Sequence, residues 1–391
     1  MKYRIRGLLA ASTLTATSFV SCDSSGTFPA EAVPISCPAD SGKAVTLVVG
    51  ARANSPAPRL PDEIQGLVRE AAKQSQKIQV VRVDGVPTVA LTATFKTEGK
   101  NSTIRDRDLR NFLGQTGGYV SALQPKQPQA DVLAALTLAA RSTPEGGTIV
   151  LMDSGIPTTG PLSFQNAEMF SAPPGEVVAF LRAEKLLPDL AKRSVVLVGV
   201  GDTADPQPAL PENLHKQVVA LWTSVAEKAE ASCVYPLKAA PSRTAIQTKV
   251  PVSVVQLPKT PEFPPCGTTV LGDNSPVGFT AGTAEFRDPK GARATLQKLA
   301  DRMRGHTQRV KLTGTTSSEG SEESNQDLSV RRARTVRQEL TELGVAESRI
   351  TATGAGEHGP NHVRDTTPDG ALIPSAAGRN RSVVVTLACD S

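Results

Sequence analysis

Aromatic residues are scarce in this chain: Phe, Trp and Tyr make up 4% of its 391 residues, with one Trp and three Tyr. Proteins that hold single-stranded nucleic acid stack its bases on aromatic side chains, so this composition argues against that class. Histidine is also scarce, with four residues in all. Because His supplies many metal ligands and acid–base groups, few such sites can be built from four residues. From both shortages we expect no metal, no cofactor, no nucleic-acid partner and no enzymatic activity.

Neither sign of charge dominates, since 43 Lys and Arg face 38 Asp and Glu for a net charge of +5. So small an excess, spread along the chain, does not indicate DNA binding, and it suits an anionic wall or lipid surface. Hydrophobic residues at 39% and charged residues at 21% are typical of a globular chain. The length is sufficient for two domains.

No hydrophobic run reaches membrane-spanning length. A basic start leads into an apolar run over residues 8–20, which at about 13 residues is shorter than the roughly 20 that a spanning helix needs. This pattern is typical of a secretory signal peptide, which we place at residues 1–21. We therefore expect the mature protein to lie outside the cytoplasm.

The end of the apolar run, Phe19-Val20-Ser21-Cys22, resembles the lipobox of bacterial lipoproteins. The resemblance implies a lipid on Cys22 and attachment to a membrane surface that faces the wall or periplasm. Residues 22–43, rich in Ser, Gly, Pro and Ala, would then form a tether. The alternative is an ordinary signal peptide in which Cys22 is incidental.

Five cysteines are an odd number for an exported chain. With Cys22 lipidated, four remain, and they allow three pairings: Cys37, Cys233, Cys266 and Cys389. The pairing of Cys37 with Cys233 and of Cys266 with Cys389 encloses one predicted domain in each bridge, and an oxidising compartment permits it. The alternative is four buried thiols.

The first predicted domain, residues 44–236, alternates apolar strands with helices. The expected strands are residues 44–50, 77–83, 86–95, 148–153 and 194–201, and the expected helices are residues 61–74, 130–141, 176–191 and 211–230. Several of these strands are apolar on both faces, which is typical of a parallel sheet covered on both sides. We predict an α/β domain with a mostly parallel sheet.

A proline-dense linker is predicted over residues 237–268, with one edge strand at 251–257. The second domain, residues 269–391, has expected strands at 277–279, 309–313, 349–353 and 382–387, and helices at 292–303 and 328–343. The predicted order is β-α-β-α-β-β, a small α+β domain.

The last long helix carries an arginine on its apolar side. With Leu328 at zero and 100° per residue, Arg332 falls at about 40°, close to the apolar stripe. We place the helix start at Asn325, a good N-cap residue, so that Arg332 lies within the first two turns. An inward Arg near a helix N-terminus suits a carboxylate or phosphate. The alternative is that Arg332 only pairs internally, with Glu285 or Asp301 as partner.

Three segments carry a resemblance to a known family: residues 314–320 (GTTSSEG), residues 325–333 (NQDLSVRRA) and residues 378–381 (GRNR). They resemble the OmpA-like peptidoglycan-associating family, whose pattern is Gly-x-Thr-Asp, Gly, Asn-x-x-Leu-Ser-x-x-Arg-Ala. The resemblance implies non-covalent binding of peptidoglycan through the diaminopimelate end of its stem peptides. In this family a loop Asp and the helix Arg hold the zwitterionic ligand, with the Asn nearby.

Carried over residue by residue, Arg332 matches the family Arg and Asn325 matches the family Asn, but Ser317 stands where the family has Asp. A hydroxyl cannot give the ligand ammonium a charge-assisted bond, so we predict weak or altered wall binding. A nearby loop glutamate is a possible substitute: Glu319, Glu322 or Glu323. The alternative is a structural or partner-binding protein with a degenerate domain and no wall ligand.

The strand pattern of residues 44–236 is similar to von Willebrand factor type A domains. That family binds a divalent metal through Asp-x-Ser-x-Ser after the first strand, whereas this chain has Gly50, Arg52 and Asn54 there. Asp153 matches a later family Asp, and one carboxylate beside an Arg does not suit a hard cation. We expect a metal-free domain that binds an unknown protein partner. A rival class is an envelope enzyme or transport component that uses a cleft in this domain, and a pocket uniting His215 with Asp153 or Asp202 would favour it.

Overall fold

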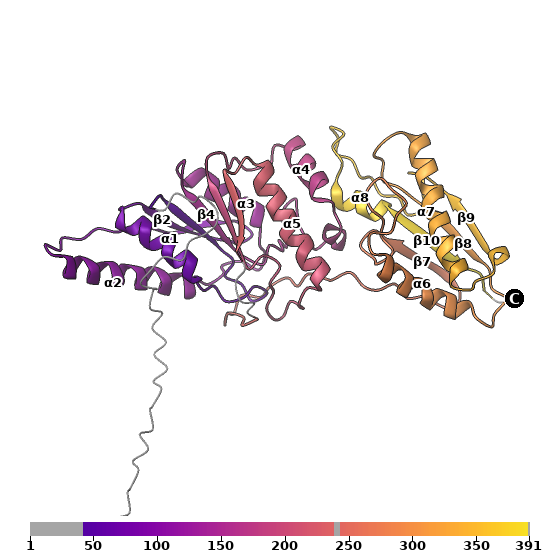
Figure 1. The fold of residues 1–391 in the computed structure, drawn as a ribbon, viewed down its shortest axis with the longest axis horizontal. Coiled ribbons are helices and arrows are strands. Elements are labelled where there is room, and N and C mark those ends of the chain that lie inside the picture. The colour runs from indigo at the N-terminus through magenta and orange to yellow at the C-terminus, as the bar shows by residue number, and fades with distance from the viewer. Residues whose placement is uncertain (1–41, 238–242, 390–391) are drawn as a thin grey trace, which may run out of the picture.

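The computed structural model describes residues 42–237 and 243–389. The predicted signal peptide, Cys22, Cys37 and nearly all of the predicted tether lie outside these residues. The described chain forms two domains that lie side by side, with the N-terminal domain in indigo to pink and the C-terminal domain in orange to yellow (Figure 1). Within the described residues no helix is long and apolar enough to cross a membrane.

The N-terminal domain is built on a six-stranded sheet of order β3-β2-β1-β4-β5-β6. The strands are β1 (Val45–Val49), β2 (Lys77–Arg82), β3 (Thr88–Thr94), β4 (Thr148–Met152), β5 (Ser194–Val198) and β6 (Cys233–Leu237). All neighbours are parallel except β3, which pairs antiparallel with β2 at the edge. The three central strands are buried along their whole length, so the predicted α/β class with a mostly parallel sheet is confirmed.

Helices cover both faces of this sheet. They are α1 (Asp62–Lys73), α2 (Ser102–Ser121), α3 (Val132–Ser142), α4 (Pro174–Ala183) and α5 (Glu212–Lys228), with a short 3₁₀ turn η1 (Ala167–Phe170). Apolar residues of α1 and α2 form one core against the sheet. Those of α3, α4 and α5 form the other. This two-sided burial explains why the central strands are apolar on both faces.

The sequence-based account of this region is corrected in four places. The helix expected over residues 176–191 ends at Ala183, and Lys185 then adopts a left-handed φ of 58°. Helix α2 and strand β6 were not predicted at all. The edge strand expected at residues 251–257 does not form. Instead the side-chain amide of Gln207 bonds both backbone groups of Val255, at 2.8 and 2.9 Å, which satisfies them without a strand partner.

The C-terminal domain has a four-stranded sheet of order β7-β10-β8-β9. Its elements are β7 (Gly267–Gly272), α6 (Pro289–Met303), β8 (Val310–Gly314), α7 (Glu322–Glu342), η2 (Glu347–Arg349), β9 (Ile350–Gly354), α8 (Pro374–Asn380) and β10 (Ser382–Leu387). Strand β10 is antiparallel to both β7 and β8, and β8 is parallel to β9. Helices α6 and α7 pack their apolar sides on the sheet in one core.

The expected order β-α-β-α-β-β lacks one helix, and the position of its first strand is wrong. The first strand lies at β7, earlier than the predicted 277–279, and the short helix α8 precedes the last strand. Phe279 makes only an isolated bridge with Phe286.

A disulfide joins the two ends of the C-terminal domain. Cys266 precedes β7 and Cys389 follows β10, and their Cα atoms are 4.7 Å apart. This confirms the predicted pairing of Cys266 with Cys389. Cys233 is also disulfide-bonded, and its predicted partner, Cys37, lies outside the described residues.

Candidate functional site

Arg332 points into the C-terminal domain from α7. The residue is 2% exposed, so the inward direction predicted from helical phase is confirmed. The predicted helix start is wrong, because the Ser321 hydroxyl accepts from the Ser324 N–H at 3.2 Å and caps the helix four residues before Asn325. Arg332 therefore lies beyond the unpaired N–H groups of the first turn and gains little from them.

Among the described residues Arg332 has one hydrogen-bond partner, a backbone carbonyl. Its Nε donates to the Thr283 oxygen at 3.0 Å, and its guanidinium carbon lies 5.2 Å from the centre of the Phe279 ring. Among the described residues no carboxylate approaches it within the 4.0 Å of an ion pair, so neither predicted internal partner, Glu285 or Asp301, is used. Its two terminal nitrogens therefore have no protein acceptor within residues 42–237 and 243–389. Burial lowers the pKa of Arg332 to about 10, against an opposing effect of Asp273.

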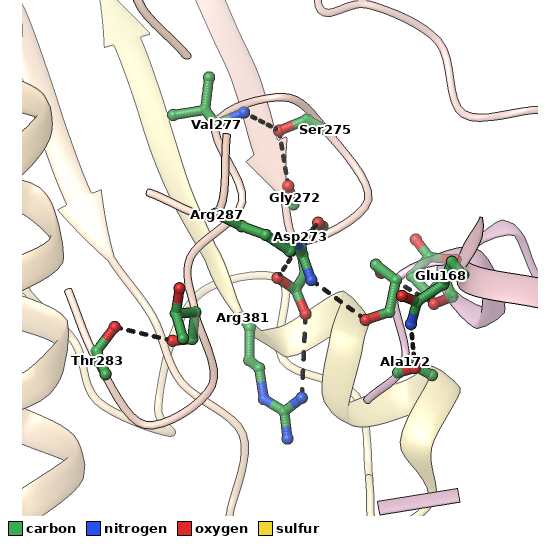
Figure 2. Close-up of polar contacts among 12 residues, drawn as sticks. Glu168, Ala172, Gly272, Asp273, Ser275, Val277, Thr283, Arg287 and Arg381 are labelled. Atoms are coloured by element: carbon green, nitrogen blue, oxygen red, sulfur yellow. Dashed lines mark hydrogen bonds and ion pairs between the residues drawn. The ribbon is translucent and has the colours of Figure 1, made fainter. Parts of the chain in front are cut away.

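Three arginines surround one buried carboxylate, that of Asp273, and we call Arg287, Arg332 and Arg381 the arginine cluster. Figure 2 shows Asp273 between Arg287 and Arg381. Arg287 Nη2 donates to Asp273 Oδ1 at 2.9 Å, and Arg381 Nη1 lies 3.9 Å from Oδ2. Burial raises the pKa of Asp273, although all three arginines oppose the shift. The cluster thus carries more positive charge than its one buried acid neutralises.

The other two predicted site residues differ in position. Ser317 is 5% exposed, and its hydroxyl accepts from Arg381 Nε at 3.3 Å, so it lies at the arginine cluster. Asn325 is buried too, but its amide donates to Glu357 Oε2 at 3.0 Å. Of the three loop glutamates considered as substitutes for an Asp at 317, Glu319 is the one near the cluster, 3.6 Å from Arg381.

A buried carboxylate that sequence reasoning missed lies beside Ser317. Asp365 is 1% exposed, and its Oδ2 accepts from the Ser318 N–H at 3.0 Å and from the Asn380 amide at 2.8 Å. Its Oδ1 has no hydrogen-bond partner in the described part of the chain. Asp365 follows a polar loop without periodicity, so no local pattern indicated that it would be buried.

A comparison with protein-family models matches residues 278–371 to the OmpA family. This part of the chain is an OmpA-family domain. The match covers α6, β8, α7, β9 and most of the residues of the site described above.

Solved structures similar to this chain have low TM-scores. A peptidoglycan-associated lipoprotein from Burkholderia pseudomallei is 22% identical, covers 30% of this chain and 89% of its own, and has a TM-score of 0.25. The cell wall anchor of the T6SS from Pseudomonas aeruginosa is 25% identical over 32% of this chain and 81% of its own, with a TM-score of 0.25. The periplasmic domain of MotB from Helicobacter pylori is 16% identical over 34% and 82%, with a TM-score of 0.27. No curated protein matches the chain.

The N-terminal domain reaches into the site of the OmpA domain. Arg381 Nη2 donates to Glu176 Oε2 of α4 at 2.8 Å, and the two side chains are 7% and 15% exposed. Arg287 Nη1 donates to the Ser171 carbonyl, which lies next to η1, at 3.3 Å. Burial raises the pKa of Glu176, against the attraction of Arg381. The site therefore lies where α8 meets α4 (Figure 1).

A further buried arginine, Arg52, lies at the carboxyl ends of β1 and β4 in the N-terminal domain. Arg52 bonds both oxygens of Asp153, with Nη2 at 2.9 Å from Oδ1, and also donates to Ser154 Oγ at 3.1 Å. Asp153 Oδ1 accepts in addition from the Gly155 N–H at 2.7 Å. The Asp153 carboxylate that would have served a metal is thus bonded to a guanidinium. The resemblance to von Willebrand factor type A domains remains a prediction.

His215 and Asp202, considered for an enzyme, do approach each other. His215 Nε2 is 3.3 Å from Asp202 Oδ1, with side chains 39% and 22% exposed. Asp153 is bonded to Arg52 instead. The pair has the exposure of a surface contact, and we assign it no chemistry.

Proposed function

We propose that this chain is a lipid-anchored cell-envelope protein whose OmpA domain associates non-covalently with peptidoglycan. The observation that carries the proposal is Arg332, a buried arginine of an OmpA-family domain whose terminal nitrogens have no acceptor among the described residues. The lipobox-like end of the predicted signal peptide, at Cys22, supports the anchor. The proposed ligand group is the diaminopimelate carboxylate.

The charge of the arginine cluster suits such a ligand. A planar guanidinium with a free edge can donate two parallel hydrogen bonds to one carboxylate, and such charge-assisted pairs are among the stronger hydrogen bonds. Burial works against the charge of Arg332 and lowers its pKa to about 10. A bound carboxylate would offset that burial cost, because a nearby negative charge favours the protonated guanidinium.

The site offers the ammonium group of the ligand weaker contacts than it offers the carboxylate. Ser317 offers a hydroxyl in place of a carboxylate, so we expect weaker binding than in a domain with Asp at this position. Ser317 also motivates a second candidate function, a structural or partner-binding envelope protein whose OmpA domain has no wall ligand. We further propose that the chain is not an enzyme and that its N-terminal domain binds a protein partner.

The test is co-sedimentation of the full chain with purified peptidoglycan, using Arg332→Ala and the neighbouring Arg331→Ala. Arg331 is the matched control, because it is half exposed and pairs with Asp327 on the outer side of α7. We expect Arg332→Ala to weaken retention at least about tenfold, the size of one hydrogen bond to a charged group. Arg331→Ala should bind as the wild type does. Equal retention of the wild type and Arg332→Ala would exclude Arg332 as the binding residue.

A further inference from the structure

The ion pair between Arg381 and Glu176 joins two domains and is largely withdrawn from water. Glu176 lies in the first turn of α4, and Arg381 lies between α8 and β10. Their side chains meet at 2.8 Å with exposures of 7% and 15%. Separating the domains would end the attraction between these two charges, but it would also return both of them to water, so the two effects oppose each other and the pair can be exchanged.

Arg381 has three acids around it, of which Glu176 is the closest. Glu319 is 3.6 Å away and 62% exposed, so solvent screens its attraction. Asp273 is 3.9 Å away and already bonded to Arg287. Removing Glu176 would therefore leave three arginines against Asp273 and the exposed Glu319. The excess of one positive charge is what a single carboxylate ligand would neutralise.

We propose that Glu176 is an internal competitor for the carboxylate of peptidoglycan, so that α4 must leave the OmpA domain before the wall is bound tightly. This inference rests on the proposed function of the arginine cluster. Glu176 presents a carboxylate to Arg381 from the side of the N-terminal domain, as a ligand acid would from solution. Only molecules in which α4 has left the OmpA domain would bind tightly. The apparent dissociation constant is therefore the intrinsic constant divided by the fraction of such molecules.

The contact has the features of a reversible one. Its ion pair and hydrogen bonds use charged and backbone groups, since Arg287 bonds the Ser171 carbonyl across the junction, although α8 also packs against η1 and α4. Polar contacts between domains separate more readily than large apolar ones. Burial raises the pKa of Glu176, which shows that Arg381 only partly offsets the loss of water. Arg381 Nη1 also has no hydrogen-bond partner among the described residues, although it is buried. It is therefore available to a second acceptor.

The experiment compares binding of a diaminopimelate-containing stem peptide to the full chain and to Glu176→Gln, by calorimetry. Glutamine keeps the size of the side chain and removes its charge, and Glu176→Lys is the stronger version because it repels Arg381. We expect affinity to rise about tenfold for Glu176→Gln and further for Glu176→Lys. The control is Glu145→Gln, which removes an exposed acid of the same domain, 3.0 Å from Lys192, and should leave affinity unchanged.

Small-angle scattering gives a second readout, because saturating peptide should increase the radius of gyration of the wild type. Equal affinities of the wild type, Glu176→Gln and Glu176→Lys, together with loss of binding in Arg332→Ala, would overturn the competitor role and leave the proposed function intact. Absence of binding in every variant would overturn the proposed function and this inference with it.

Discussion

Each domain holds a buried arginine beside an aspartate at a strand end, but the two are satisfied differently. Arg52 finds its counter-ion within its own domain, where Asp153 meets it with both oxygens and Ser154 accepts a further bond. Arg381 lies 3.9 Å from Asp273, which is too far for a hydrogen bond, and its nearest acid, Glu176, belongs to the other domain. The pair of Arg52 and Asp153 forms within one domain, whereas the pair of Arg381 and Glu176 forms only where the two domains are in contact.

This difference distinguishes an arginine that stabilises its own domain from an arginine that can exchange its partner for a ligand. A guanidinium whose partner is fixed in the same core cannot be released without unfolding that core, so its removal affects stability. A guanidinium whose partner lies across a domain boundary can exchange that partner for a ligand when the boundary opens. We therefore assign Arg52 to the stability of the N-terminal domain and Arg381 to the proposed binding of peptidoglycan.

The largest effect that tests this assignment is expected from Arg52→Met. It leaves Asp153 as an uncompensated buried charge, so the free energy of unfolding should fall by about 3–5 kcal/mol. Urea unfolding followed by Trp222 fluorescence measures it, because this residue, the only tryptophan, is buried in the N-terminal domain and donates to the Gly155 carbonyl at 2.7 Å.

The matched control is the double variant Arg52→Met with Asp153→Leu, which removes both charges and should recover most of the loss. A loss below about 1 kcal/mol in Arg52→Met would contradict the structural role, because surface charges show effects of that size.

A smaller effect is expected when the acid of the arginine cluster is neutralised by Asp273→Asn. Burial raises the pKa of Asp273, which means that the fold already disfavours its ionised form relative to the neutral one. The free energy of unfolding should therefore fall less than it does in Arg52→Met, because the fold does not favour the ionised form of Asp273. Affinity for the stem peptide should rise about threefold to tenfold, because one competing negative charge is gone. Calorimetric unfolding and peptide titration measure the two quantities, and a loss of stability as large as that of Arg52→Met would remove the distinction between the domains.

Local pattern in the sequence predicted part of this arrangement. The apolar stripe of α7 predicted that Arg332 faces inward, and cysteine spacing predicted the bridge between Cys266 and Cys389. The helix start was misplaced because Asn325 and Ser321 are both favourable N-cap residues, and the choice between them depends on the preceding loop. Helix α2 was missed because its hydrophobic residues do not form a clear stripe, with only Leu113, Thr116 and Val120 buried.

The decisive contacts of the site had no local signal. Glu176 and Arg381 are 205 residues apart in sequence, and nothing in either segment indicates that the two domains meet there. Asp365 is similar, because its burial depends on Ser318 and Asn380, which come from two other segments. Periodicity reports which side of an element is covered, but it does not report which distant side chain covers it.

The smallest and most specific effect is expected from Ser317→Asp, which restores the family carboxylate to the loop. Ser317 lies 3.3 Å from Arg381 Nε, so a carboxylate there would pair partly with Arg381 and partly with the ligand ammonium. We expect the ratio of affinities for the diaminopimelate peptide and for an analogue lacking the side-chain amino group to rise about fivefold, since the new charge-assisted bond needs that ammonium. The analogue itself should bind no better, because the added charge repels its carboxylate.

Ser317→Asn is the neutral control of equal size, and its ratio should match that of the wild type. Equal gains for both ligands in Ser317→Asp would mean that the substitution acts by displacing Glu176 from Arg381 rather than by holding the ammonium.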